Sequence, residues 1–362
     1  MKKILALIMV FALAMPLLVG CAGTTVIVGG NCECGNQNII VECNCNCQNS
    51  GGTQTQGVLK TGLSVSTKIS DSTSATADKD GQAAYDLTIA AVVVDSNGVI
   101  VSCVIDSVPA TVKFNASGVI TSDINMSVPT KNELGENYGM VAWGGAKYEW
   151  DIQVAAVAQY AVGKTVEQLK NGDINMETGK AKDGTDLASS ATIYLAGYVY
   201  AIEAAVNNAK ALGAQAGDTL VLSTMNNIKS SVDATAAKAG TIQLDSDIVA
   251  LTKRGETVTS CYLDAVQAKV SVDATGKITL PEKVETKNEL GDNYGMVAWG
   301  GAKYEWNVQA ASFASYITGK TASEIAGISV TESTKPADGT DLSSSVTIAI
   351  GGFQALIAKA MA

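Results

Sequence analysis

A short motif rich in serine and threonine occurs twice and places a threonine hydroxyl where it could carry a phosphoester. The first copy reads Asp186-Leu-Ala-Ser-Ser-Ala-Thr192, and the second reads Asp341-Leu-Ser-Ser-Ser-Val-Thr347. Each copy precedes an apolar run with helical spacing, so its hydroxyl residues stand where helix N-caps are preferred. The free N–H groups and the positive dipole end of a helix start together favour a phosphate group. An ordinary Ser/Thr cap is the alternative reading of either copy alone.

A second repeated stretch is unusually aromatic. Residues Thr130–Trp150 recur at Thr286–Trp306 with one change, Asp292 in place of Glu136. All four tryptophans lie in these two copies, although only 5% of the chain is aromatic. Flat rings beside glycines suit a surface where a planar ligand approaches the backbone closely. Packing alone tolerates exchanges among apolar residues, so the near-identity indicates a stricter constraint; a recent duplication is the alternative explanation. We call this stretch the aromatic block.

In each repeat, the elements that position these motifs are expected to be β-strands first and then helices. Runs of β-branched residues around tight-turn sequences predict hairpins. In the first copy the expected strands are Ala84–Asp95 and Val99–Val108 around Ser96-Asn97-Gly98, then Ala110–Phe114 and Gly118–Thr121. In the second copy they are Thr257–Ala265 and Ala268–Val272, followed by a turn at Asp273–Gly276.

Helices are expected after each aromatic block. Residues Asp151–Val162 and Asn307–Thr318 have helical spacing, with Asp151 or Asn307 as the N-cap. A final helix is expected over about Thr192–Leu212, and over Thr347–Ala362 in the second copy. Strands followed by helices predict the α+β class.

The repeats keep a nearly constant offset along the chain, which predicts two tandem homologous domains. We place them at residues 58–207 and 218–362, each a mostly antiparallel sheet followed by packed helices. One cysteine falls in a predicted strand of each domain, Cys103 and Cys261. We interpret both as small buried hydrophobic residues that do not form a bridge.

The first residues predict export. Lys2 and Lys3 precede an apolar run that ends at Cys21, a pattern that resembles a bacterial lipoprotein signal over residues 1–20, with Cys21 as the acylated residue. Residues 21–57 then form a polar tether with too little apolar content to fold. The tether carries Cys32, Cys34, Cys43, Cys45 and Cys47. Disulfides, a thiolate metal site and an unpaired reactive cluster all remain open for these cysteines.

The composition excludes several classes of function. A net charge of −10 without a basic cluster argues against nucleic-acid binding. Histidine is absent, which rules out Ser-His-Asp triads and the common catalytic zinc sites. We therefore predict no catalytic residues and assign no residue as a metal ligand.

The serine and threonine motif resembles the acceptor motif of FMN-binding domains that are modified by the flavin transferase ApbE. This resemblance implies that FMN is joined through its phosphate to Thr192 and Thr347, two covalent cofactors in all. It makes Asp186 and Asp341 the motif aspartates, and Ser189 and Ser344 the hydroxyl positions. The sequence departs from the pattern at Ser190 and Ser345, where glycine is usual, and at Val346, which replaces alanine.

Taken with the signal, tether and repeats, both domains resemble the PplA-type flavinylated lipoproteins of Gram-positive extracellular electron transfer. The resemblance implies an electron carrier, rather than a turnover enzyme, anchored by lipid to the outer face of the cell membrane. Its partners would be an ApbE-type transferase, a quinone-linked membrane reductase as donor, and extracellular electron acceptors. The aromatic block would bind the flavin through Tyr138, Met140, Trp143, Gly144, Gly145, Lys147 and Tyr148, and through Tyr294, Met296, Trp299, Gly300, Gly301, Lys303 and Tyr304.

Two other classes compete with the electron carrier. One is a cell-surface lipoprotein that binds a sugar or another planar ligand through its aromatic block, without flavin. The other is a thiol-redox or metal-buffering lipoprotein that acts through the cysteines of the tether.

Overall fold

A computed structural model describes residues 58–362 of the chain. The predicted signal at residues 1–20, the tether at 21–57 and its cysteines, including Cys21, lie outside the described residues.

The first sheet has three antiparallel strands in the order β1-β2-β3, formed by Lys60–Lys68, Gly81–Val94 and Ile100–Phe114. The predicted turn at residues 96–98 is confirmed. Asp95 Oδ1 accepts hydrogen bonds from the backbone N–H groups of Asn97 and Val99, and Gly98 has a positive φ of 76°. An Asx turn followed by a left-handed glycine closes the hairpin between β2 and β3.

The predicted break at Val108 was wrong, because β3 continues through Pro109 to Phe114. Pro109 pairs with Asp86 of β2, and β3 is an edge strand of this sheet. A proline without an N–H group is tolerated where that group would face the free edge. The predicted strand at residues 118–121 is reduced to an isolated bridge between Ile120 and Phe114.

The second sheet repeats this order and adds a short strand. Its order is β6-β7-β8-β9, formed by Thr219–Asn227, Gly240–Arg254, Thr257–Val272 and Ile278–Thr279. The sequence predicted two strands where β8 is continuous, and the predicted turn at residues 273–276 is confirmed by the positive φ of Gly276, 70°. A small hairpin pairs β4 (Ile174–Asn175) with β5 (Lys180–Ala181).

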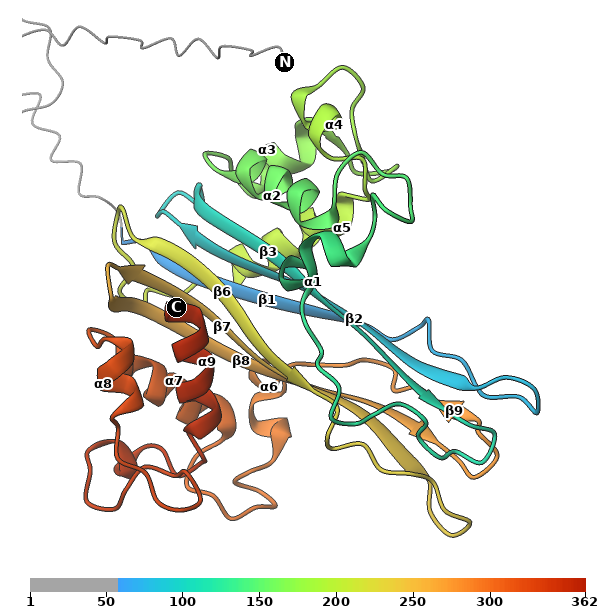
Figure 1. The fold of residues 1–362 in the computed structure, drawn as a ribbon. Helices are drawn as coiled ribbons and strands as arrows, with labels where there is room; N and C mark the ends of the chain where they lie inside the picture. The colour runs from blue at the N-terminus through green and yellow to red at the C-terminus, as the bar shows by residue number, and fades with distance from the viewer. Residues whose placement is uncertain (1–57) are drawn as a thin grey trace, which may run out of the picture. The chain divides into compact units, whose positions relative to one another are not determined.

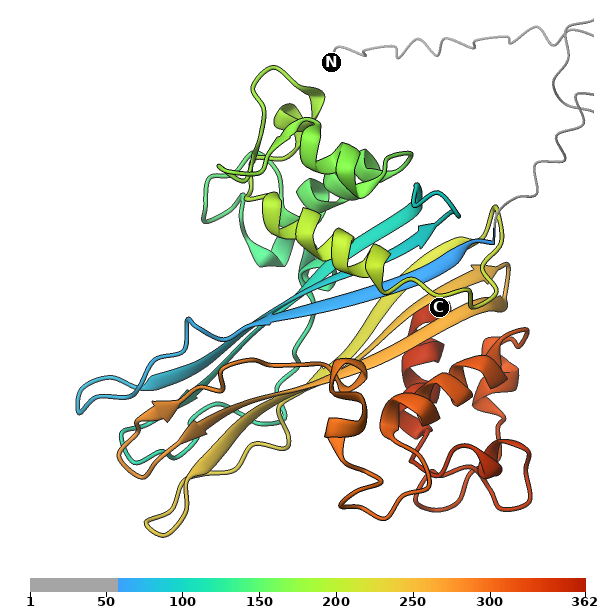
Figure 2. The same ribbon diagram turned by 180° about the vertical axis from the view of Figure 1, so that it is seen from behind.

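The two larger sheets share one hydrophobic core. Phe114 of β3 and Ile242 of β7 are both fully buried in it, together with Leu87 of β2. Polar contacts also join the sheets: the Tyr85 hydroxyl donates to the Ile242 carbonyl at 2.8 Å, and the Thr61 and Ser260 hydroxyls lie 2.6 Å apart. The strands of both sheets run side by side in Figures 1 and 2.

Helices cover the other face of each sheet (Figure 1). The first sheet is covered mainly by α2 (Trp150–Ala161) and α5 (Ala196–Asn207), and the second by α7 (Trp306–Ile317) and α9 (Gly351–Met361). Shorter helices are α1 (Lys131–Leu134), α3 (Val166–Asn171), α4 (Asp186–Ser190), α6 (Lys287–Leu290) and α8 (Ala322–Ala326), with 3₁₀ turns η1 (Gly135–Tyr138), η2 (Gly291–Tyr294) and η3 (Leu342–Ser344). The mixture of helices with antiparallel sheets confirms the α+β class.

Burial on both faces of the sheet explains the continuous apolar run of β2, where Ala90–Val94 are all buried.

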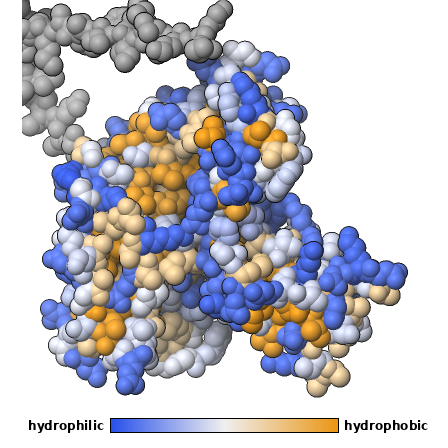
Figure 3. Space-filling model, in the orientation of Figure 1, coloured by the Kyte–Doolittle hydropathy of each residue, from blue (hydrophilic) through white to orange (hydrophobic). Residues whose placement is uncertain are grey.

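On the face seen in Figure 3, apolar side chains are interrupted by hydrophilic ones. Within residues 58–362, no helix combines the length and apolar composition needed to cross a membrane.

The predicted helix starts need correction. The N-caps of α2 and α7 are Glu149 and Glu305, and the predicted caps Asp151 and Asn307 lie two residues further along the chain, inside the helices. Asp151 Oδ1 and Asn307 Oδ1 are buried and have no hydrogen-bond partner within residues 58–362. The final helices begin at Ala196 and Gly351, four residues after the threonines that were expected to start them. They also end earlier than predicted, at Asn207 and Met361.

The two strand cysteines carry free thiols in the described part of the chain. Cys261 in β8 is buried, and Cys103 in β3 is half-buried. Burial raises the pKa of Cys103 to about 12 and raises that of Cys261 as well. Because the thiolate is the reactive form, both side chains behave as inert apolar groups.

Candidate functional site

The aromatic block begins with a capped helical turn that is fixed to the sheet. Thr130 Oγ1 accepts from the Glu133 N–H, and Glu133 Oε2 accepts from the Thr130 N–H at 2.9 Å, a reciprocal capping box. The Asn132 N–H donates to Asp106 Oδ1 at 3.1 Å, and the Asn132 amide donates to the Ile105 carbonyl at 2.9 Å. The second copy repeats each of these contacts around Thr286, Asn288 and Asp264. The block is thus held directly on β3 and β8.

A buried carboxylate holds the loop that follows. Glu149 accepts from the backbone N–H groups of Met140 and Val141 at 2.8 and 2.9 Å. In the second copy, Glu305 accepts from Met296 and Val297, both at 2.8 Å. Carboxylate bonds to N–H groups are among the stronger hydrogen bonds in proteins. Glu149 and Glu305 therefore set the path of both loops, and the sequence reasoning did not single them out.

The tryptophans of these loops are exposed. Trp143 is 83% exposed and Trp299 is 82% exposed, and Gly144, Gly145, Gly300 and Gly301 beside them are exposed as well. The Trp143 ring lies on Gly139, where a Cβ atom would come within 2.4 Å of it, and Gly139 has a φ of 81°. Glycine is required there for both conformation and space.

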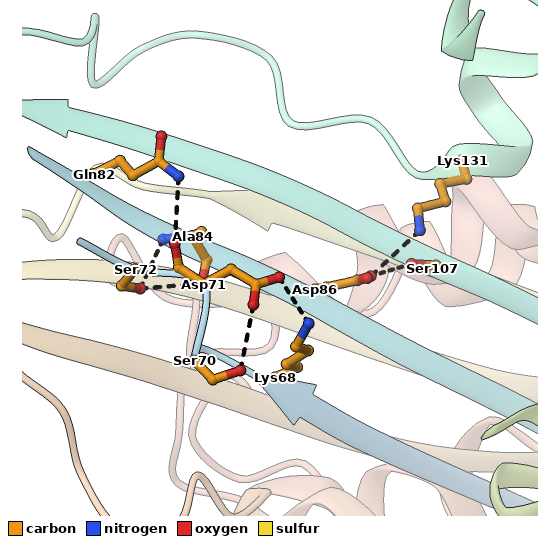
Figure 4. A network of polar contacts seen from close by, with 9 residues as sticks. All are labelled: Lys68, Ser70, Asp71, Ser72, Gln82, Ala84, Asp86, Ser107 and Lys131. Carbon is orange, nitrogen blue, oxygen red and sulfur yellow. Dashed lines mark hydrogen bonds and ion pairs between the residues drawn. The ribbon is translucent and has the colours of Figure 1, made fainter. Parts of the chain in front are cut away.

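Two aromatic rings of the block flank a buried lysine. The Lys131 ammonium lies 5.2 Å from the ring centroids of both Tyr138 and Trp150. It also pairs with Asp86 at 3.5 Å, and Asp86 accepts from the Ser107 hydroxyl at 2.6 Å (Figure 4). In the second copy, Lys287 lies 5.0 Å from the rings of Tyr294 and Trp306. These cation–π contacts place a positive charge within an aromatic cluster.

The serine and threonine motif forms a short helical turn in both copies. Helix α4 begins at Asp186 and is capped by the Thr185 side chain. The hydroxyls of Ser189 and Ser190 both donate back to the Asp186 carbonyl, at 2.7 and 3.1 Å. In the second copy, Ser344 donates to the Asp341 carbonyl at 2.9 Å, and Ser345 donates to the Leu342 carbonyl at 3.3 Å. Local hydrogen bonds thus engage the serine hydroxyls.

A buried glutamine holds each motif threonine. Gln153 Oε1 accepts from the N–H and the hydroxyl of Thr192 at 2.8 and 3.2 Å, and from the Ile193 N–H at 3.3 Å. The Gln153 amide donates to the Tyr148 carbonyl at 2.8 Å. Gln309 makes the same bonds to Thr347, Ile348 and Tyr304, at 2.7, 3.2, 3.1 and 2.7 Å. Each glutamine therefore joins the aromatic block to an exposed threonine.

The expected helix start at the threonine was wrong in its local detail. The Thr192 N–H is not free, because Gln153 accepts its hydrogen bond, and Ala191 has an extended backbone. The threonine hydroxyl remains on an exposed residue in both copies.

A lysine gives the block and the motif a second connection. Lys147 Nζ donates to the Ser189 carbonyl at 3.4 Å and lies 4.7 Å from the Tyr148 ring centroid. Lys303 contacts the Ser344 carbonyl at 3.4 Å and lies 4.9 Å from the Tyr304 ring. An exposed ammonium group therefore stands beside each motif.

An open pocket of about 360 Å³ lies next to Thr192 in the first copy. Its walls are mainly apolar and aromatic, with one hydroxyl and one ammonium group, and are formed by Thr88, Lys131, Tyr138, Met140, Trp150, Ile193, Tyr194, Gly197 and Tyr198. The Trp150 indole N–H donates to the Tyr198 hydroxyl at 2.8 Å, and burial raises the pKa of Tyr198 to about 12. The volume and lining are those of a small-molecule site. Of the predicted ring-contacting residues, Tyr138 and Met140 line it, whereas Trp143 lies on the exposed loop.

The sequence reasoning missed the residues that connect the site. Gln153 and Gln309 are polar residues on the buried faces of apolar helices, and Lys131 and Lys287 lie inside the repeated block. A polar residue that recurs at the core position of both helices was the available signal.

Asp264 should make stability fall as the pH rises. Burial raises its pKa from about 3.8 to about 6, although backbone N–H groups of Asn288 and Ala265 oppose this. A carboxyl whose folded pKa exceeds its unfolded value favours folding at low pH, and this contribution is lost as pH rises through about 6. We expect the free energy of unfolding to fall by about 2–3 kcal/mol from pH 4 to 6.5.

Urea unfolding at several pH values measures this slope. Asp264→Asn, which keeps an acceptor oxygen but cannot titrate, should flatten it. Asp273→Asn is the control, because Asp273 is exposed and its pKa is lowered by hydrogen bonds, first from the Thr275 hydroxyl. An unchanged slope in Asp264→Asn would contradict the assignment.

Comparison of the chain with protein-family models, curated proteins and solved structures gives no match. Among residues 58–362, no group of three or more Cys, Asp or Glu side chains is arranged to hold a metal ion.

Proposed function

We propose that the chain is a membrane-anchored extracellular electron carrier with FMN bound covalently to Thr192 and Thr347. The main support is an arrangement that occurs twice with nearly the same distances. In each copy a buried glutamine beside the aromatic block accepts a hydrogen bond from the hydroxyl of an exposed threonine. Residues 58–207 and 218–362 are then two homologous FMN-binding domains packed together through their sheets.

The surroundings of Thr192 suit a phosphoester. The residue is exposed, so a transferase can reach its hydroxyl, and Lys147, which contacts the Ser189 carbonyl of the same motif, offers a positive charge for the phosphate. Attachment requires an activated donor that carries FMN in a phosphoanhydride. The bond from threonine Oγ1 to phosphorus forms, and the anhydride bond breaks so that the other phosphate of the donor leaves with its electron pair. The hydroxyl proton goes to a base of the transferase.

The pocket beside Thr192 fits a flat aromatic ring. Tyr138, Trp150 and Met140 supply apolar and aromatic walls, and Lys131 supplies a positive charge. FMN bound there would take up and release electrons, while these side chains hold the ring and tune its electrostatic environment. In the second domain the corresponding residues are Tyr294, Trp306, Met296 and Lys287.

The proposed location follows from the N-terminal sequence. Acylated Cys21 and the tether of residues 21–57 would hold the carrier at the outer membrane face. There the carrier would accept electrons from a quinone-linked reductase and pass them to external acceptors. Covalent attachment keeps the cofactor from being lost at an open surface.

Mass spectrometry of the intact protein and its peptides tests this proposal directly. The protein is co-produced with a flavin transferase as wild type, Thr192→Ala and Thr347→Ala. We expect FMN on both threonine peptides, each lost completely in its own variant. Thr178→Ala is the matched control, because Thr178 is exposed in the same domain and its side chain has no role in the site. Unmodified threonines despite an active transferase would refute the proposal.

The exposed tryptophans favour one second candidate, a surface lipoprotein that binds a sugar or another planar ligand. Trp143 and Trp299 stand on matching loops, and aromatic rings of this exposure are suited to stacking on a ligand. An intact lipoprotein without flavin, whose ligand binding is lost in Trp143→Ala and Trp299→Ala together, would support this candidate.

A further inference from the structure

The two sites differ at one position on the sheet. Thr88 lines the first pocket, and its neighbour Ile89 pairs with Asp106. In the second sheet Ile248 pairs with Asp264, so the position equivalent to Thr88 is Asp247. A neutral hydroxyl in the first site is thus replaced by a carboxyl group in the second.

The Asp247 carboxyl group faces the second site. Gly352 takes the place of Gly197, which lines the first pocket, and a Cβ atom on Gly352 would lie 3.7 Å from Asp247 Oδ2. Asp247 is partly buried, and burial raises its pKa. The charged groups that face it are Lys287, which opposes this shift, and Asp245, which adds to it.

Two other charged groups have a counterpart in each site. Lys131 and Lys287 are equivalent members of the aromatic block, and Asp86 and Asp245 hold equivalent register positions in β2 and β7. Asp247 therefore adds one negative charge that the first site does not have.

Two hydroxyl groups are also lost from the second site. The equivalents of Tyr194 and Tyr198 are Ala349 and Phe353. Phe353 packs against Trp306 with ring centroids 5.9 Å apart, whereas Tyr198 accepts a hydrogen bond from Trp150. The second site is therefore more negative and has fewer hydrogen-bond donors than the first.

We infer that Asp247 makes the Thr347 flavin the lower-potential member of the pair. This inference rests on the proposed function. A quinol-type donor loses two electrons and two protons; the flavin ring gains both electrons and one proton, and the second proton goes to solvent. The reduced ring carries a negative charge, so a carboxylate at the same site disfavours reduction. Electrons would then pass downhill from the Thr347 site to the Thr192 site.

Spectroelectrochemical titration of the flavin-loaded full chain tests this order. Thr192→Ala and Thr347→Ala assign each midpoint to one site, and mass spectrometry measures FMN occupancy in every variant. We expect Asp247→Asn to shift the oxidised-to-reduced ratio of the Thr347 flavin about tenfold toward reduction, equivalent to about 30 mV for a two-electron couple. The Thr192 flavin should not change.

The reciprocal variant Thr88→Asp distinguishes an electrostatic effect from a local folding defect in Asp247→Asn. Thr88→Asp should lower the midpoint of the Thr192 flavin by a similar amount, and Glu256→Gln, in the exposed turn before β8, should shift neither midpoint. Two loaded sites with equal midpoints, or no shift in either variant, would overturn this inference alone. A Thr347 peptide without FMN would overturn it together with the proposed function of that site.

Discussion

Gln153→Leu is expected to reduce FMN on Thr192 at least tenfold while FMN on Thr347 stays unchanged. Gln153 Oε1 accepts three hydrogen bonds from Thr192 and Ile193, and its amide reaches the Tyr148 carbonyl. Leucine fills the same space but leaves these groups without their partner. We also expect a loss of about 1–3 kcal/mol in stability, because unsatisfied polar groups carry a desolvation cost. Peptide mass spectrometry measures the ratio of the two modified peptides in one molecule.

The chain offers matched controls for this result. Gln159→Leu makes the same change at an exposed position of α2 and should leave both sites modified. Gln309→Leu should reverse the pattern, with loss at Thr347 and retention at Thr192. Equal modification of Thr192 in Gln153→Leu and wild type would contradict a positioning role for this glutamine.

Part of the local structure was predictable from the sequence, although the strands β1, β6 and β7 were not expected. The turn at residues 96–98 carries an Asx turn and a glycine that needs a positive φ, and both signals are local. The α2 and α7 helices were placed within one residue of their bounds, because their apolar spacing extends over the whole helix. The order of strands before helices then gave the correct α+β class.

Features that depend on distant contacts were not predictable. Pro109 is accommodated within β3 because β3 is paired with a neighbouring strand on one side only. This is a property of the sheet and not of the local sequence. Where the two sheets share a core, a strand can be buried on both faces. Its sequence then lacks the alternation of apolar and polar residues that marks a strand exposed on one face. The sequence alone therefore did not show which strands are buried on both faces.

In the candidate site, too, the residues marked by a local pattern were predicted and those that depend on distant contacts were not. The repeated motif and block located Thr192, Lys147 and Tyr148, since near-identity of two copies is visible in the sequence. The hydrogen bond between Gln153 and Thr192 joins residues that lie 39 positions apart in the sequence, so no local sequence pattern predicts it. The carboxylate Glu149 lay inside the block, yet its buried, loop-holding role depends on the fold.

That role leads to the second large effect, which we expect for Glu149→Ala. The carboxylate accepts two backbone N–H bonds from the loop at Met140 and Val141, and it stands at the start of α2, where negative charge is favoured. Alanine leaves both N–H groups unpaired and removes the charge. We expect the free energy of unfolding to fall by about 3–6 kcal/mol, the sum of two hydrogen bonds to a charged acceptor at about 1.5–3 kcal/mol each. Urea denaturation measures this difference.

The loop should respond before the whole domain unfolds. Because Glu149 holds the chain just after Tyr138, its loss should free one wall of the pocket and speed hydrogen exchange over residues 139–146. Glu167→Ala removes the same charge from an exposed position in the first turn of α3 and serves as the control, with little change in either quantity. Glu305→Ala should give the matching result in the second copy, where Met296 and Val297 depend on the same carboxylate contact. Wild-type exchange rates in Glu149→Ala would mean that the loop is held by the Trp143 and Gly139 packing instead.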